Sequence, residues 1–299
     1  MERRRQLFCY LMVAPALILV LVLGVYPMID SLRLSFLQYD LMRIHTEGTP
    51  FVGLQNFKTV LEMPGFLQTL QNTIVAVSFV VPAVVALGLI VASAMNQEFR
   101  GRGTLRSLVL IPWVTPPVVA SAIWMWMLQP ERSPINQALR ALGIIDVNIR
   151  FLTDPRQFGP LSIPLLSVGL VRVWSGLPFV SVMLLAGLQS IPREMYEAAD
   201  IDGANGFQKF FYITLPQLRS VLIVLFTLLF IGGIGIFDVH YVMTGGGPRN
   251  LTNVLSVLAY RQAFTFYRFD LASTITTIIL GITGLISIFY VRSLMKTEL

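Results

Sequence analysis

Six long apolar segments alternate with polar stretches along the chain. A helix needs about 20 apolar residues to cross the hydrocarbon core of a bilayer. The segments cover residues 7–29, 73–95, 107–128, 161–188, 221–243 and 271–291. The residue-by-residue alternation that is typical of membrane β-barrels is missing from the sequence. The pattern therefore predicts an all-α, polytopic membrane protein with six transmembrane helices.

Composition agrees with a membrane location. The chain has 299 residues, 55% of them apolar, and its mean hydropathy is +0.71. The start, MERRRQ followed by an apolar run, is similar to a signal peptide, but the run is longer than an h-region and no A-x-A pattern follows, so we expect a retained first span. Cys9 is the single cysteine, which excludes an internal disulfide and a cysteine metal cage, and we expect it to be a small buried residue.

The net charge of +6 is interpreted as basic residues that flank the spans and meet anionic lipid, rather than as a nucleic-acid surface. The tightest clusters are residues 3–5 and the group Arg100, Arg102 and Arg106. Lys and Arg prefer the cytoplasmic side of a membrane. Both termini and the loop of residues 188–219 are therefore predicted to be cytoplasmic.

The polar segment of residues 190–216 separates the fourth and fifth spans. Ser190 and Pro192 are typical of a helix start, and Glu194 and Glu197 lie near the positive end of that helix. Gly203 permits the left-handed residue that ends it. An Asn205-Gly206 turn, a second short helix with Phe207, Phe210 and Phe211 on one face, and a break at Pro216 are expected to follow.

The charge of this polar segment distinguishes two interpretations of it. Residues 194–216 contain four acids, Glu194, Glu197, Asp200 and Asp202, against one base, Lys209. An amphipathic connector resting on lipid headgroups fits the phenylalanines, but anionic lipid would repel the acids. A docking surface for a protein partner fits both.

The spacing within the loop carries a family resemblance. Glu197-Ala198-Ala199 is followed after three residues by Gly203, after nine more by Ile213, and then by Leu215-Pro216. This pattern resembles the EAA loop of permease subunits in binding-protein-dependent ABC importers. The resemblance implies a cytoplasmic coupling helix that inserts into a cleft of an ATPase subunit, and we therefore call residues 190–216 the coupling loop. The residues that it implies in coupling are Glu197, Ala198, Ala199, Asp202, Gly203, Ile213, Leu215 and Pro216.

Other segments extend the resemblance over nearly the whole chain. FVGLQNF (51–57), VWSGLPF (173–179) and MTGGGPRNLT (243–252) are similar to segments of permeases of the sugar and glycerol-3-phosphate branch. The chain resembles the first permease of maltose- and trehalose-type systems. The implied organisation is an N-terminal span and external segment (1–69), an importer transmembrane domain of five spans (70–292) and a cytoplasmic tail (293–299).

The resemblance also implies a substrate path along spans four and five. Its matching positions are Arg172, Gly176, Phe179, Leu229, Gly232, Gly233 and Ile236, and Trp174 joins the path as an aromatic that, like Phe179, could stack on a sugar ring. Two alternatives stay open. Arg172 could be a structural ion-pair partner of Asp238, and the glycines could serve close helix packing. Asp238 and His240 are expected at the external rim.

No enzyme or cofactor motif accompanies these features. The sequence has no G-x-x-x-x-G-K-[ST] motif, no metal-ligand spacing and no nucleophile pattern. We therefore expect no catalytic residue, metal or cofactor in this chain, with ATP and Mg²⁺ bound by the partner. The implied partners are a second permease, two copies of an ABC ATPase, an external solute-binding protein and the lipid of a prokaryotic inner membrane, without nucleic acid. An ion-gradient-driven transporter or channel, or a membrane scaffold, remains the alternative.

Overall fold

The computed structural model describes residues 2–295. The predicted tail of residues 293–299 therefore lies largely outside the described residues, as do the side chains of residues 3–5 and Cys9. Two compact units are present: unit 1 comprises Met1–Phe66 and Leu258–Gly281, and unit 2 comprises Leu67–Val257 and Ile282–Leu299. The division of the chain at residues 69 and 292 stays a prediction.

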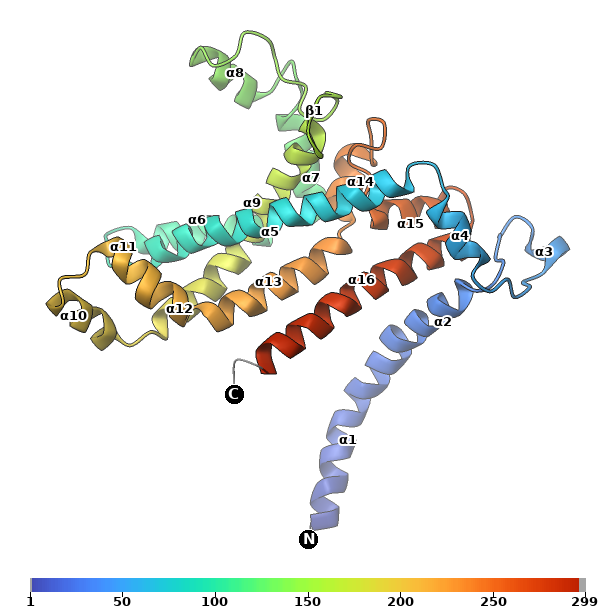
Figure 1. The fold of residues 1–299 in the computed structure, drawn as a ribbon, viewed down its shortest axis with the longest axis horizontal. Coiled ribbons are helices and arrows are strands. Elements are labelled where there is room, and N and C mark those ends of the chain that lie inside the picture. The colour runs from blue at the N-terminus through green and yellow to red at the C-terminus, as the bar shows by residue number, and fades with distance from the viewer. Residues whose placement is uncertain (1, 296–299) are drawn as a thin grey trace. The chain divides into compact units, whose positions relative to one another are not determined.

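The described chain is mostly helical (Figure 1). Its first half contains α1 (Glu2–Val20), the π-helix η1 (Leu21–Val25), α2 (Tyr26–Leu34), α3 (Ile44–Glu47), α4 (Gln55–Leu61), α5 (Phe66–Asn96), α6 (Arg102–Val114), α7 (Pro117–Met127) and α8 (Pro134–Ala141). A short antiparallel hairpin of β1 (Gln157–Phe158) and β2 (Leu161–Ser162) follows. The second half contains α9 (Ile163–Gln189), α10 (Arg193–Ile201), α11 (Gly206–Lys209), the π-helix η2 (Phe210–Thr214), α12 (Leu215–Gln217), α13 (Arg219–Ile234), α14 (Asp238–Thr244), α15 (Leu255–Phe264) and α16 (Phe269–Met295).

The six predicted apolar segments divide into continuous and broken helices. Four are long enough to cross a membrane without a break: Tyr10–Leu34, Phe66–Asn96, Ile163–Gln189 and Phe269–Tyr290. The third segment bends by 99° between α6 and α7. Pro116 and Pro117 explain this break, because a residue before proline is pushed out of the helical region, and Thr115 is extended with a ψ of 121°.

The fifth segment is also broken, and its predicted extent to Met243 as one helix is wrong. α13 ends at Ile234, and a new helix starts at Asp238. Gly232, Gly233 and Gly235 weaken the helix near that point, since glycine is a poor helix former. At its other end α13 meets the short helices of residues 206–217 at an angle of 66°.

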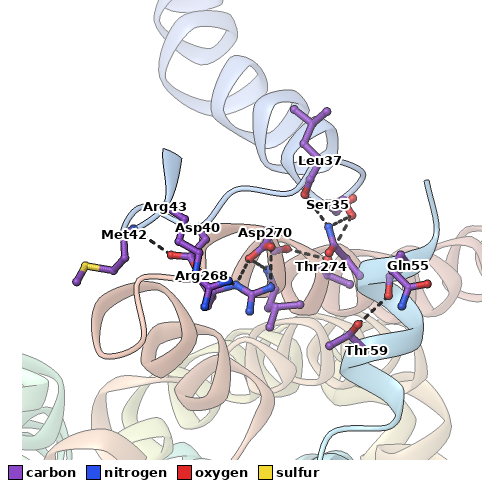
Figure 2. Close-up of polar contacts among 12 residues, drawn as sticks. Ser35, Leu37, Asp40, Met42, Arg43, Gln55, Thr59, Arg268, Asp270 and Thr274 are labelled. Atoms are coloured by element: carbon purple, nitrogen blue, oxygen red, sulfur yellow. Dashed lines mark hydrogen bonds and ion pairs between the residues drawn. The ribbon is translucent and has the colours of Figure 1, made fainter. Parts of the chain in front are cut away.

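Unit 1 contains an apolar helix with exposed side chains and a cluster of hydrogen-bonded polar residues. This cluster, which we call the polar knot, comprises Ser35, Asn56, Arg268, Asp270 and Thr274. The segment Tyr10–Leu34 exposes its apolar side chains over most of its length. Figure 2 shows the knot at the end of α2. The Arg268 guanidinium pairs with the fully buried Asp270 carboxylate at 2.9 Å, and Thr274 Oγ1 donates to the carbonyl of Ser35 at 3.4 Å. Asn56 Nδ2 donates to that same carbonyl at 3.0 Å, so side chains satisfy the backbone where the helix ends.

Unit 2 has its core between α5, α9 and α13. Val84 and Val85 on α5 pack with Val180 and Leu184 on α9 and with Leu225 on α13. The approach of α5 to α9 is close at Gly88, where an added Cβ would lie 2.6 Å from the Cγ1 atom of Val180. The helix α9 begins with a side-chain cap, because Ser162 Oγ accepts the N–H of Leu165 at 3.1 Å.

Two polar clusters fix the loops at the end of unit 2 where α9 begins. Asn72 Nδ2 donates to the carbonyls of Asn250 and Asn253 at 2.7 and 3.1 Å, which holds the glycine-rich loop against α5. Arg156 pairs with Asp154 at 2.7 Å near the β1–β2 hairpin. The Arg156 guanidinium holds the pKa of that carboxyl below its usual range.

Candidate functional site

The coupling loop begins at the C-terminal end of α9, and Figure 1 shows α10, α11 and α12 gathered there. The helix α10 starts at Arg193, with Pro192 at the N-cap position. The predicted role of Ser190 as its capping residue is wrong. Ser190 instead ends α9, and its hydroxyl donates to the carbonyl of Gly187 at 2.8 Å. Glu194 lies in the first turn of α10, as predicted.

The end of α10 is a Schellman motif. The N–H of Ala204 donates to the carbonyl of Ala199 at 2.9 Å, and that of Gly203 to the carbonyl of Asp200 at 3.1 Å. Gly203 has a φ of +76°, which confirms the predicted left-handed residue. Asn205 and Gln208 then form a reciprocal capping box that starts α11. Two local motifs thus fix the turn between the two helices.

One face of α10 is anchored on the core of unit 2. Met195 and Tyr196 pack against the buried residues of α9 and α13, and so does Ile213 from η2. The hydroxyl of Tyr196 hydrogen-bonds to that of the buried Thr214 at 2.9 Å. The two halves of the coupling loop are therefore tied to each other and to the bundle.

The opposite face of α10 is exposed. Glu194, Glu197, Ala198 and Ile201 share it at helical spacing, and Ile201 is 87% exposed. The other loop residues implied in coupling are distributed around it: Asp202 and Pro216 are exposed, and Ala199 and Leu215 are half-buried. Lys209 pairs with Asp200, and Glu197 makes no described ion pair. The exposed face therefore presents unmatched acids beside small and apolar side chains.

The aromatic face predicted for the second short helix is present in a different geometry. Phe207 and Phe211 are exposed, and Phe210 is half-buried. The rings of Phe210 and Phe211 meet edge-to-face with centroids 5.1 Å apart. Only residues 206–209 are α-helical, and a π-helical turn carries the next five residues.

A small cavity inside unit 2 collects part of the predicted substrate path, and we call it the central cavity. It has a volume of about 30 Å³, which is room for one or two water molecules. Five of the eight predicted residues line it: Arg172, Gly176, Leu229, Gly233 and Ile236. Thr73 on α5 and His240 on α14 also line it.

The other three predicted path residues lie elsewhere. Trp174 meets Trp124 edge-to-face with centroids 5.6 Å apart. Phe179 packs against the core of unit 2. Around Gly232, no described side chain lies within 4 Å of an added Cβ, whereas Gly233 packs against Val77. Neighbouring glycines on α13 thus have different environments, and only Gly233 serves close packing.

The polar groups at the central cavity are under-satisfied. Arg172 makes one long side-chain hydrogen bond, from Nη1 to Ser175 Oγ at 3.4 Å. Among the described residues, no carboxylate lies within 4 Å of its guanidinium, so the structure shows no direct ion pair with Asp238, although the two charges attract each other at longer range. Asp238 Oδ1 accepts the N–H of Val239 at 3.0 Å instead. Arg172 thus keeps most of its donors for other partners.

His240 is the site residue that the sequence missed. It was expected at a solvated rim, but its side chain is 1% exposed. Neither ring nitrogen has a hydrogen-bond partner in the described chain. Ile236 and His240 are four residues apart, which would place them on one face of a continuous helix. Because the helix is interrupted between Ile234 and Asp238, this spacing does not predict where the His240 side chain lies.

Comparison with known proteins identifies the chain's relatives. The profile of the binding-protein-dependent transport system inner membrane component family matches residues 84–296. The chain belongs to this family. Its members are permease subunits of ABC importers, and the EAA spacing of the coupling loop agrees with that membership. The expected family and the helical, multi-pass membrane fold are therefore confirmed.

Individual relatives agree with the assignment. The trehalose/maltose transport system permease protein MalF of Thermococcus litoralis is 39% identical over 84% of this chain and 81% of its own length. The sulfoquinovosyl glycerol transport system permease protein SmoG of Agrobacterium fabrum is 32% identical over 96% and 90%. A bacterial alginate ABC transporter solved with its pentasaccharide-bound periplasmic protein has a chain of the same fold, with a TM-score of 0.79, 21% identity and coverage of 97% and 94%.

Proposed function

We propose that the chain is the permease subunit of an ATP-driven ABC importer that moves a sugar or related carbohydrate into the cytoplasm. The relatives named for trehalose and maltose and for sulfoquinovosyl glycerol support a carbohydrate solute. The observation that supports the ATP-driven mechanism is the exposed acidic face of α10. The opposite face of this helix packs against the core through Met195 and Tyr196. A rigid helix that presents an unpaired face is suited to transmit the motion of a partner.

In this proposal, two cytoplasmic ATPase subunits bind ATP and Mg²⁺, and one of them receives α10. Closure of the ATPases moves α10, and the movement reaches the bundle through the Tyr196–Thr214 hydrogen bond and the packing of Ile213. This chain and a second permease then rock to expose the path alternately to the two sides. An external solute-binding protein delivers the sugar, and both termini lie in the cytoplasm.

The central cavity limits what this chain contributes alone. Pockets for small ligands usually measure about 300–1,000 Å³, and the cavity holds about 30 Å³. A sugar ring therefore passes either between the two permeases or through a state in which α5, α9 and α13 have separated. Arg172 supplies hydrogen-bond donors to hydroxyl or acidic groups of the solute in that state.

The first experiment is purification of the tagged full-length chain from mild-detergent membranes, with identification of what is recovered. We expect a second permease and an ABC ATPase. Glu197→Lys should reduce ATPase recovery by more than tenfold, because reversing a charge at an interface costs several kcal/mol. Glu131→Lys, which makes the same change at an exposed acid outside the coupling loop, is the control. Equal recovery with Glu197→Lys would refute the docking role.

Transport measurements distinguish an ATP-driven importer from an ion-gradient-driven transporter or channel. Uptake should persist when the ion gradient is collapsed and stop when ATP is depleted. The opposite result would assign the chain to gradient-driven transport. A scaffold without transport activity would show neither dependence.

A further inference from the structure

A basic pocket lies beside the coupling loop, and the transport cycle described above does not use it. Its volume is about 260 Å³. It is lined by Arg106, Val109 and Leu110 of α6, Val182, Leu185 and Gln189 of α9, and Met95 of α5. Met95 and Gln189 are close to the ends of their helices, and Arg106 is in the second turn of α6. The pocket therefore opens at the end of unit 2 that carries α10.

The guanidinium groups at this end have unmet hydrogen-bonding capacity. Arg106 lines the pocket, and Arg102 lies four residues before it on the same face of α6, just outside the lining. The Nε atom of each is buried and has no hydrogen-bond partner in the described chain. Among the described residues, no carboxylate forms an ion pair with either side chain. The buried Nε atoms are closed to an outside acceptor, so a ligand would be bound through the remaining N–H groups of the two guanidinium groups, which no described carboxylate engages.

The walls of the pocket change from polar to apolar away from the helix ends. Beyond Arg106 and Gln189 the lining is aliphatic. A neighbouring groove of about 470 Å³ shares Leu110 and continues past Ile111 and Val114 to Pro116, where α6 breaks. From Arg106 to Val114 a helix rises about 12 Å, which matches a large part of an acyl chain. Ile111 and Val114 are exposed along this track.

We propose that the pocket binds an anionic phospholipid, with the phosphate on Arg106 and Arg102 and an acyl chain along the groove beside α6. Basic pockets between membrane helices attract anionic headgroups. The pocket has guanidinium donors at one end, and an apolar groove leads away from them. This is the order of the headgroup and the acyl chain in a phospholipid. An acidic protein surface would use the donors but would leave the groove unfilled. The proposal requires only that the chain lies in a membrane, and it is independent of the solute and of the ATPase.

The bound lipid would also adjoin the coupling loop. Glu98, in the segment between α5 and α6, pairs with Arg193 at the start of α10 at 3.6 Å. Leu185 and Met95 line the pocket and belong to the same core on which Met195 and Tyr196 of α10 are anchored. The bound headgroup would therefore link the lipid composition of the membrane to the packing of α10 against the core.

The test is retention of phosphatidylglycerol by the purified full-length chain after exchange into mixed phosphatidylcholine–phosphatidylglycerol nanodiscs, followed by native mass spectrometry. Wild type should retain phosphatidylglycerol in preference to phosphatidylcholine. Arg106→Gln and Arg102→Gln should each weaken that retention about fivefold, as expected for one basic side chain at a lipid surface. Arg106→Lys should keep most of it, and Arg100→Gln, at an exposed position outside the pocket, should keep all of it.

A second variant tests the acyl track without changing charge. Leu110→Trp should fill the space that the pocket and the groove share, and it should lower phosphatidylglycerol retention while the thermal unfolding temperature stays close to that of wild type. Equal losses with Arg100→Gln and Arg106→Gln would reduce the effect to diffuse surface charge and overturn the proposal. Unchanged lipid retention in Arg106→Gln, with less ATPase recovered, would mean that the pocket receives an acidic protein surface instead.

Discussion

The coupling loop and the central cavity are built in opposite ways. The loop takes its shape from neighbours in sequence: a Schellman motif at Gly203, a capping box at Asn205, and a tie between Tyr196 and Thr214. The cavity takes its lining from α5, α9, α13 and α14 and from the connecting segments at Ile236 and Val254. The loop exposes a face whose acids make no ion pair among the described residues, and the cavity buries unpaired polar groups inside the bundle. Substitutions in the loop should therefore affect assembly, and substitutions in the cavity should affect the solute.

The largest effect is expected where the loop depends on a single backbone conformation. Gly203→Val places a β-branched residue at a φ of +76°, which is a strained conformation for valine. The end of α10 would unwind, and ATPase recovery and uptake should fall by more than tenfold. Gly203→Asn is the control, since asparagine tolerates the left-handed region. Wild-type uptake in Gly203→Val would show that coupling does not depend on this turn.

A substitution in the central cavity should change solute binding and leave assembly with the ATPase unchanged. Arg172→Met removes a half-buried charge that makes one long hydrogen bond within the chain. Because little is lost in the folded protein and a desolvation cost is relieved, the thermal unfolding temperature should not fall. If Arg172 binds the solute, the KM for uptake should rise about 10- to 100-fold, the usual effect of losing a hydrogen bond that involves a charged group.

ATPase recovery is the second readout for Arg172→Met. It should equal that of wild type, because the cavity and the exposed face of α10 use different residues. A lower unfolding temperature with an unchanged KM would assign Arg172 a structural role and remove it from the path.

Two glycine substitutions should have intermediate effects on stability. One glycine, Gly88, is tightly packed, and the other, Gly232, faces open space. Gly88→Ala would place a Cβ atom 2.6 Å from the stiff, buried Val180 side chain, and overpacking of this kind costs about 1–3 kcal/mol. Gly232→Ala meets nothing within 4 Å and should stabilise α13 by about 0.5–1 kcal/mol. Unfolding temperatures of the two variants, measured in the same detergent, should move in opposite directions.

Local signals explain why the turn at Gly203 could be predicted and the polar environment of the cavity could not. The glycine at 203 and the acid at Glu194 act on their own helix, so position in the sequence is enough to assign them. The burial of His240 and the separation of Arg172 from Asp238 depend on which way α14 points after the break at Gly235, and this is set by packing against α7 and α9. The polar knot around Asp270 and Arg268 was missed for the same reason, because its partners lie in the segment after α2, at Ser35 and Asp40, and in α4.

The spans show a similar contrast. The four continuous helices follow from apolar length alone. The positions of the two breaks needed more than length. Proline chemistry predicts a kink near Pro116 but not its size, and glycines near 235 are compatible both with close packing and with a helix end.

The smallest effect is expected at a salt bridge far from both sites. The Asp154 carboxylate, paired with Arg156, has a pKa below its usual range. A lowered carboxyl pKa contributes stability that is complete at neutral pH and is lost as the pH falls below about 4 and through the folded-state pKa. Arg156→Gln should therefore lower the thermal unfolding temperature slightly at neutral pH, and the difference from wild type should shrink as the solution is acidified. A difference that stays constant with pH would mean that Arg156 acts through packing of its aliphatic stem and not through its charge.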